Sequence, residues 1–153
     1  MSTMYKIRSA AIAACLFLQA LLPNMALAVD DTKASGTVDL TSARAKIHAG
    51  NFTAAVEELR GLAEDTQQVD IYNLLAFSLR KSGDFTTSLS YYNKALSLQP
   101  DYKPAREYLG ELYLDTGDIA KAKDQLAELT KLCPTGCEEL SDLQKAFTAK
   151  SIQ

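Results

Sequence analysis

The stretch "RKSGDFTTS", residues 80–88, ends one helical pattern and begins another. Apolar residues recur at helical spacing on both sides of it, at Ile71, Leu74, Leu75 and Leu79 before it and at Leu89, Tyr92 and Leu96 after it. Gly83 can adopt the positive φ that ends a right-handed helix, and Asp84 can accept hydrogen bonds from the free N–H groups of the helix that follows. The stretch therefore predicts two helices that fold back on each other as a hairpin.

The same turn recurs along the chain at an almost constant spacing. Gly50-Asn51-Phe52 precedes Gly83 by 33 residues, and Gly117-Asp118-Ile119 follows it by 34. Such a period is typical of helical repeat proteins, in which each hairpin buries its apolar face against the next one. The sequence therefore predicts an all-α fold, an α-solenoid of about three helical hairpins.

The residues between the turns repeat with the same period. Counted from Val69, positions 7, 8, 11, 20, 24, 27 and 32 hold Leu75, Ala76, Leu79, Ser88, Tyr92, Ala95 and Pro100. Counted from Lys103, the same positions hold Leu109, Gly110, Tyr113, Ala122, Leu126, Leu129 and Pro134. This pattern resembles the tetratricopeptide repeat family. The resemblance implies an array over residues 37–134, with repeats at about 36–68, 69–102 and 103–136, of which the first is the most degraded.

One more helix is expected after the third repeat, over residues 137–150. Leu140, Leu143 and Phe147 give it an apolar face, and its outer residues are charged, as suits a helix that caps the last repeat. The segment "LCPTGCEEL" at 132–140, which follows "REYLGELYL" at 106–114, resembles a group of small exported bacterial tetratricopeptide repeat proteins without assigned chemistry.

The first 28 residues have the layout of a secretory signal peptide. Lys6 and Arg8 precede an apolar run over 9–22, and residues 26–28, Ala-Leu-Ala, form a small-x-small cleavage pattern. Because a helix that spans a bilayer needs roughly 20 apolar residues, we expect cleavage after Ala28 and a periplasmic protein that does not insert into the membrane. An uncleaved signal that anchors the protein in the inner membrane is the alternative. Residues 29–36 are expected to be a flexible lead-in.

The charge of the chain disfavours two classes of partner. Loss of the leader removes two of the 16 basic residues and none of the 19 acidic ones, so the net charge goes from −3 to −5. Nucleic acid and anionic membrane surfaces attract clustered Lys and Arg rather than an acidic chain. We therefore expect no nucleic-acid partner.

Cys133 and Cys137 lie four residues apart, across the turn that leads into the capping helix. In an exported protein this proximity favours a disulfide, which would pin the cap to the array. Two unpaired thiols are the simplest alternative. A redox-active pair is disfavoured because it would need the Cys-x-x-Cys spacing and a thioredoxin-like strand pattern.

No pattern in the sequence predicts catalysis. His48 is the single histidine and sits near a helix end, where its charge suits the helix dipole. The paired carboxylates Glu57-Glu58 and Glu138-Glu139 point roughly 100° apart on a helix and do not form a shared site. The sequence also lacks a phosphate-binding loop and a nucleophile elbow. We therefore expect no catalytic residue, no metal and no cofactor.

The resemblance implies that positions 2, 5, 9, 12 and 13 of each first helix line a concave groove. It assigns to partner binding the residues Asp70, Asn73, Phe77, Arg80, Lys81, Glu107, Glu111 and Leu114. Beside these lie Pro104 and Asp115 and, from the degraded first repeat, Leu40, Arg44, Ile47 and His48. The expected groove is basic around Arg44, Arg80 and Lys81 and acidic around Glu107, Glu111 and Asp115. A solvated face without a partner is the alternative.

The function expected from these features is that of a non-catalytic periplasmic adaptor or scaffold. It would bind a protein or peptide of the cell envelope, with apolar anchors giving affinity and charges setting register. One alternative is a structural subunit that docks in a larger envelope complex through its convex or cap surface. Another is a thiol-disulfide protein that uses Cys133 and Cys137.

Overall fold

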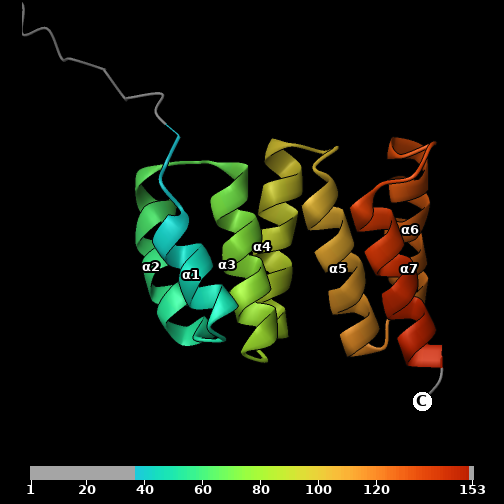
Figure 1. The fold of residues 1–153 in the computed structure, drawn as a ribbon, viewed down its shortest axis with the longest axis horizontal. Helices are drawn as coiled ribbons and strands as arrows, with labels where there is room; N and C mark the ends of the chain where they lie inside the picture. The colour runs from blue at the N-terminus through green and yellow to red at the C-terminus, as the bar shows by residue number, and fades with distance from the viewer. Residues whose placement is uncertain (1–36, 152–153) are drawn as a thin grey trace, which may run out of the picture. The chain divides into compact units, whose positions relative to one another are not determined.

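The computed structural model describes residues 37–151, which fold as seven α-helices (Figure 1). They are α1 (Thr41–His48), α2 (Phe52–Asp65), α3 (Val69–Lys81), α4 (Phe85–Leu98), α5 (Lys103–Thr116), α6 (Ile119–Leu132) and α7 (Glu138–Ser151). This confirms the predicted all-α solenoid of helical hairpins. The predicted signal peptide and lead-in lie outside the described residues, and the repeat boundaries remain predictions.

The turns between paired helices have the chemistry that the sequence predicts. Gly83 has a φ of 87°, which a residue with a side chain rarely adopts, and Asp84 accepts a hydrogen bond from the Thr87 N–H at 3.1 Å. The turns at Gly50 and Gly117 share the positive φ and the side-chain cap. These turns reverse the chain within a few residues and bring the two helices of each hairpin together.

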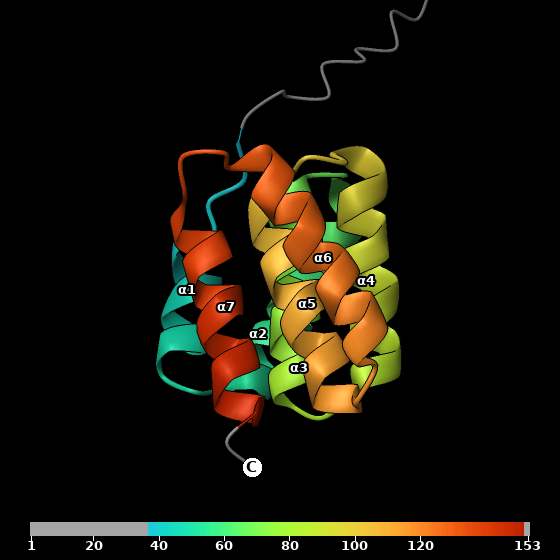
Figure 2. The ribbon, with the colours of Figure 1, turned by 90° about the vertical axis from the view of Figure 1, so that its right-hand side faces the viewer.

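The helices form two rows within this part of the chain. Figure 2 shows α1 and α7 on one side of the stack and α4 and α6 on the opposite side. We call the face formed by α1, α3, α5 and α7 the inner wall, and we call α2, α4 and α6 the outer helices. The apolar core lies between the rows in three successive clusters, centred on residues such as Leu75, Tyr92 and Leu143.

Small residues let the helices approach each other closely. The Ser88 hydroxyl donates a hydrogen bond to the Ala76 carbonyl oxygen at 2.7 Å, which joins α4 to α3. At Gly110 in α5, an added Cβ would lie 2.7 Å from a methyl carbon of Leu143, so the absence of a side chain there makes room for α7. The cap helix therefore packs directly on α5 and completes the inner wall.

Candidate functional site

The inner wall contains an apolar recess that we call the aromatic cleft. It has a volume of about 360 Å³ and is lined by Arg44, Ile47, His48, Phe52, Leu74, Phe77 and Tyr108. The Phe77 ring centroid lies 4.9 Å from that of Tyr108 and 6.3 Å from that of Phe52. Three helices and the first residue of α2 thus meet around one aromatic cluster that remains open to solvent.

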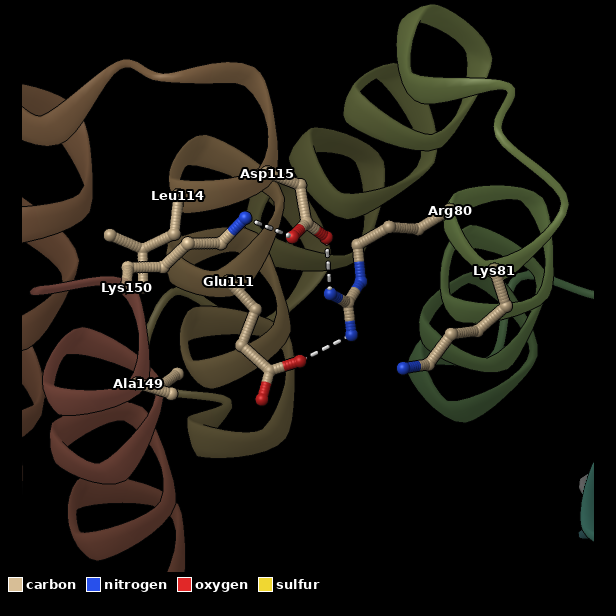
Figure 3. A pocket seen from close by; sticks show the side chains of 8 residues that line it. Arg80, Lys81, Glu111, Leu114, Asp115, Ala149 and Lys150 are labelled. Carbon is tan, nitrogen blue, oxygen red and sulfur yellow. Dashed lines mark hydrogen bonds and ion pairs between the residues drawn. The ribbon is translucent and has the colours of Figure 1, made fainter. Parts of the chain in front are cut away.

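A second recess, which we call the ion-paired cleft, lies between α3, α5 and α7 (Figure 3). Its volume is about 250 Å³, and its lining is Arg80, Lys81, Glu111, Leu114, Asp115, Ala146, Ala149 and Lys150. The Arg80 guanidinium points between two carboxylates of α5, donating to Asp115 at 2.8 Å and to Glu111. Lys150 of α7 reaches Asp115 at 3.4 Å. A chain of ion pairs thus joins α3, α5 and α7.

Arg80 does not form part of an open basic region of the groove, as the sequence analysis expected. Only 5% of the residue is exposed, and its charge is paired with Glu111 and Asp115 of the following repeat. At the other end of the wall, Asp70 accepts a hydrogen bond from the Tyr102 hydroxyl and lies 3.6 Å from Arg44. Several of the assigned charges are therefore used to join neighbouring helices.

Lys81 and Phe77 remain available to a partner. Lys81 is exposed, and no carboxylate of the described residues pairs with it. Its ammonium nitrogen lies 5.4 Å from the centroid of the Phe77 ring, within the range of a cation–π contact. Phe77 lines the aromatic cleft and Lys81 the ion-paired cleft, so these two residues link the two recesses.

Besides Arg80, three assigned residues are buried in the wall. Leu114 is buried in the apolar cluster beneath α7, although part of it borders the ion-paired cleft. Asn73 is 2% exposed, and its Oδ1 atom has no hydrogen-bond partner among the described residues. Glu107 is 7% exposed.

Burial, and after it the repulsion of neighbouring carboxylates, raises the pKa of Glu107 to about 8. These carboxylates belong to Glu111 of α5 and to Glu138, Glu139 and Asp142 of α7. We call Glu107, Glu138, Glu139 and Asp142 together the acidic corner. At neutral pH the Glu107 side chain is therefore mainly in its protonated, uncharged form.

Glu107 should make the stability of the fold depend on pH. In the unfolded chain its pKa returns to the ordinary 4.5, so between pH 4.5 and about 8 the folded chain holds a proton that the unfolded chain releases. The contribution of this group to stability is complete below pH 4.5, falls as the pH rises to about 8 and is constant beyond. The Glu107→Gln variant lacks the carboxyl group and should not lose stability in this way as the pH rises.

We therefore expect the Tm of Glu107→Gln to exceed that of the wild type by a margin that widens from about pH 5 to about pH 8. Thermal denaturation of both proteins across this range measures the margin. Glu57→Gln, on the outer helix α2, is the matched control and should show no such trend. A margin for Glu107→Gln that stays constant with pH would contradict the neutral buried acid.

Among residues 37–151, no three His, Cys, Asp or Glu side chains are grouped so that they could hold a metal ion. Within the same range, no helix is both long and apolar enough to cross a membrane. The inner wall presents ion pairs and aromatic rings instead.

The comparisons with known proteins agree with this architecture. Residues 79–146 match the family model of the tetratricopeptide repeat. This match supports the resemblance of the chain to the tetratricopeptide repeat family. The repeat-containing protein YpiA of Bacillus subtilis is 29% identical over 106 residues, which are 67% of this chain and 25% of YpiA. The uncharacterized protein ycf37 of Guillardia theta is 31% identical over 81 residues, which are 53% of this chain and 45% of that protein. The chain thus spans less than half the length of either relative.

Two solved structures that hold peptides share the fold. The Yersinia enterocolitica secretion chaperone SycD, in complex with a peptide of the translocator YopD, has a TM-score of 0.64 and 16% identity, covering 72% of this chain and 88% of that one. The first tetratricopeptide repeat domain of Spaghetti (RPAP3), bound to an HSP90 peptide, has a TM-score of 0.60 and 19% identity, covering 72% and 88%. The narrower resemblance of residues 132–140 to small exported proteins remains a prediction.

The repeat pattern did not identify every residue of the aromatic cleft. Phe52, Leu74 and Tyr108 line it but were not assigned to it from the sequence. Leu74 and Tyr108 both stand at position 6 of their repeats, outside the positions that the family resemblance implies. A bulky side chain at the same position of two successive repeats was the signal that could have found them.

Proposed function

We propose that the chain is a non-catalytic adaptor that binds a protein or peptide segment along its inner wall. The observation that carries the proposal is the aromatic cleft beside Phe77 and Lys81, an open apolar recess next to a cation without an ion-pair partner in the described residues. Such a surface offers an anchor for one apolar side chain and an attraction for one carboxylate. The similar structures of SycD and RPAP3 that hold peptides support this proposal.

Selection of displayed random peptides on the full chain tests this function. Selected peptides should lose at least about tenfold in affinity for Phe77→Ala and for Lys81→Glu, because each variant removes a contact at the centre of the wall. Lys123→Glu, a charge reversal at another exposed lysine on the outer helix α6, is the control and should bind as the wild type does. Peptides that bind all four proteins equally would place the binding surface elsewhere.

Charge reversal at Arg80 or Glu111 would be a poorer test of partner binding. The two side chains pair with each other across α3 and α5, so either reversal would disturb the wall as well as any partner contact. Lys81 offers the cleaner substitution, because its side chain is exposed.

A second candidate function is a structural subunit held through its outer helices. Four large apolar residues are more than a third exposed on α4 and α6, namely Phe85, Leu98, Ile119 and Leu132. If these residues dock the protein in a complex, Ile119→Asp should release it from that complex while Lys81→Glu should not. The adaptor proposal expects the opposite pattern in co-sedimentation with envelope fractions.

We also propose that the chain acts in the periplasm after cleavage behind Ala28. The basic residues Lys6 and Arg8 and the apolar run over 9–22 support export. N-terminal sequencing of protein from a periplasmic fraction should begin at Val29. A mature protein that begins at residue 1 or 2 and fractionates with the inner membrane would instead show an uncleaved anchor.

The oxidising periplasm would allow a disulfide between Cys133 and Cys137. Their Cα atoms lie 5.8 Å apart, a separation that a disulfide spans, with Cys133 at the end of α6 and Cys137 just before α7. We expect Cys137→Ser to lower the free energy of unfolding by about 2 kcal/mol, in line with the small loop that the bond closes. Chemical denaturation measures the loss. Dithiothreitol should destabilise the wild type by the same amount and leave the stability of Cys137→Ser unchanged. An equal response of both proteins would exclude the bond.

A further inference from the structure

Two lysines from different helices face the ion-paired cleft. Lys81 is the last residue of α3 and Lys150 lies in the last turn of α7, and both side chains line the recess of about 250 Å³ (Figure 3). In this view the guanidinium group of Arg80 lies between the two ammonium groups. The cap helix therefore supplies one wall of the cleft, in addition to covering the last apolar cluster.

The cleft has more cations than carboxylates. Its charged lining consists of Arg80, Lys81 and Lys150 against Glu111 and Asp115. Arg80 donates to Asp115 at 2.8 Å and to Glu111, so this one buried cation already pairs with both carboxylates. The excess positive charge lies at the two lysines and favours a negatively charged group of a partner. The acidic corner, which begins α7 at the end far from Lys150, would repel such a group.

Both lysines keep hydrogen-bond donors for that group. Among residues 37–151, no carboxylate pairs with Lys81, whose side chain is exposed. Lys150 contacts Asp115 at 3.4 Å, and 43% of its side chain is exposed. Because an ammonium group carries three N–H donors, Lys150 can bind a second carboxylate without leaving Asp115.

The remaining lining of the cleft is apolar and mostly small. It consists of Leu114 of α5 and of Ala146 and Ala149 of α7. The small side chains of α7 leave room in the recess, and the apolar surface suits the methylene groups of an Asp or Glu side chain. A carboxylate inside the recess is partly shielded from water, which strengthens its attraction to the lysines.

The ion-paired cleft lies close to the aromatic cleft. Phe77 and Lys81 are four residues apart in α3, which corresponds to about 6 Å along the helix axis. In an extended segment, side chains two residues apart point to the same side and are separated by about 7 Å. A segment that places an apolar side chain in the aromatic cleft can therefore present an acidic side chain to Lys81.

We propose that the ion-paired cleft receives an aspartate or glutamate side chain of the partner, held by Lys81 and Lys150. The inference rests on the proposed function and adds the cap helix to the binding surface. Lys81 and Lys150 each form an ion pair with the incoming carboxylate, one from α3 and one from α7. Arg80 offsets the charges of Glu111 and Asp115, which would otherwise repel it.

A double-mutant cycle between the partner and Lys150 tests this contact. The probes are peptides selected by display on the full chain and synthesised with amidated C-termini, so that every carboxylate is a side chain. We expect them to contain Asp or Glu, and replacement of that residue by Asn or Gln should lower affinity about tenfold for the wild type but only about threefold for Lys150→Gln. Selected peptides without an acidic residue, or an equal loss with both proteins, would overturn the proposal.

Two further variants control for the charge and the helix. Lys150→Arg keeps the cation and should show the tenfold loss of the wild type. Lys145→Gln removes a lysine of the same helix that pairs with Asp142 at 2.7 Å and does not line the cleft, so it should also behave as the wild type does. A reduced loss with Lys145→Gln would mean that α7 acts through its overall charge, contrary to the proposal.

N-acetyl-glutamate amide, with N-acetyl-glutamine amide as its neutral control, probes the cleft without a peptide. NMR of the full chain follows the Cε signals of the lysine side chains during titration with each compound. We expect the glutamate compound to shift the signals of Lys81 and Lys150 at least about threefold more than that of Lys145, whose ion pair is exposed. The glutamine compound should shift none of them. Similar shifts at all three lysines would indicate non-specific ion binding and overturn the proposal.

The outcomes separate this inference from the proposed function. Peptides that lose affinity for Phe77→Ala and Lys81→Glu but show no coupling to Lys150 would uphold the adaptor and overturn the carboxylate site. A glutamate compound that binds at Lys81 and Lys150 while no displayed peptide binds the wall would uphold the site and contradict the adaptor. Peptides whose acidic residue is coupled to Lys150, and which need Phe77, would support both.

Discussion

Replacing Arg80 by methionine is expected to lower the free energy of unfolding by about 2–3 kcal/mol. The substitution keeps much of the buried aliphatic volume but leaves Glu111 and Asp115 facing each other without their shared cation. Breaking a buried ion pair by removing one partner typically costs about 3–5 kcal/mol. The lower figure applies here because the two carboxylates are partly exposed and solvent screens them. Urea denaturation followed by circular dichroism measures the loss.

Two further variants separate the charge effect from lost packing. Arg60→Met, on the exposed surface of α2, should change stability by less than about 0.5 kcal/mol. Adding Glu111→Gln to Arg80→Met should recover part of the loss, because it removes one of the two carboxylates that lost their cation. If the double variant were less stable than Arg80→Met by the full cost of Glu111→Gln in the wild type, the two residues would not be coupled.

Replacing Leu143 by alanine is expected to cost about 2–5 kcal/mol. Leu143 is fully buried, and its methyl groups fill the space that Gly110 leaves open on α5. Its removal creates a cavity between α5 and α7 that the surrounding helices can close only in part. Because Leu143 anchors α7 to α5, the variant should also increase amide hydrogen exchange in α7 more than in α3.

Leu132→Ala is the matched control for Leu143→Ala. Leu132 is 37% exposed at the end of α6, so its truncation removes little buried area and should cost less than about 1 kcal/mol. Equal destabilisation by the two variants would mean that Leu143 contributes no more to stability than the partly exposed Leu132 does.

The turns and the helix pairing could be predicted because their cause is local. A glycine that takes a positive φ, followed by an Asp or Asn that caps the next helix, specifies a reversal within a few residues. The period of 33–34 residues then specifies that each hairpin stacks on the next. Gly110 fits the same logic, because a small residue at that position of the repeat allows close helix contact.

The charges of the wall could not be predicted in the same way. Position within the repeat correctly placed Arg80, Glu111 and Asp115 along neighbouring helices, but it did not show that they pair with one another across 31 and 35 residues of sequence. Nor did it distinguish Glu107, which is buried, from Lys81, which is exposed. The pairing of these charges and the burial of each side chain depend on how the helices pack against one another in the whole array.

Binding along the inner wall is tested most directly by amide hydrogen exchange of the full chain with and without a display-selected peptide. We predict slower exchange in α1, α3 and α5 around Phe77 and Tyr108, no change in the outer helices α4 and α6, and no protection in the Phe77→Ala variant. Protection confined to α4 and α6, near Phe85 and Ile119, would contradict the inner wall as the binding surface.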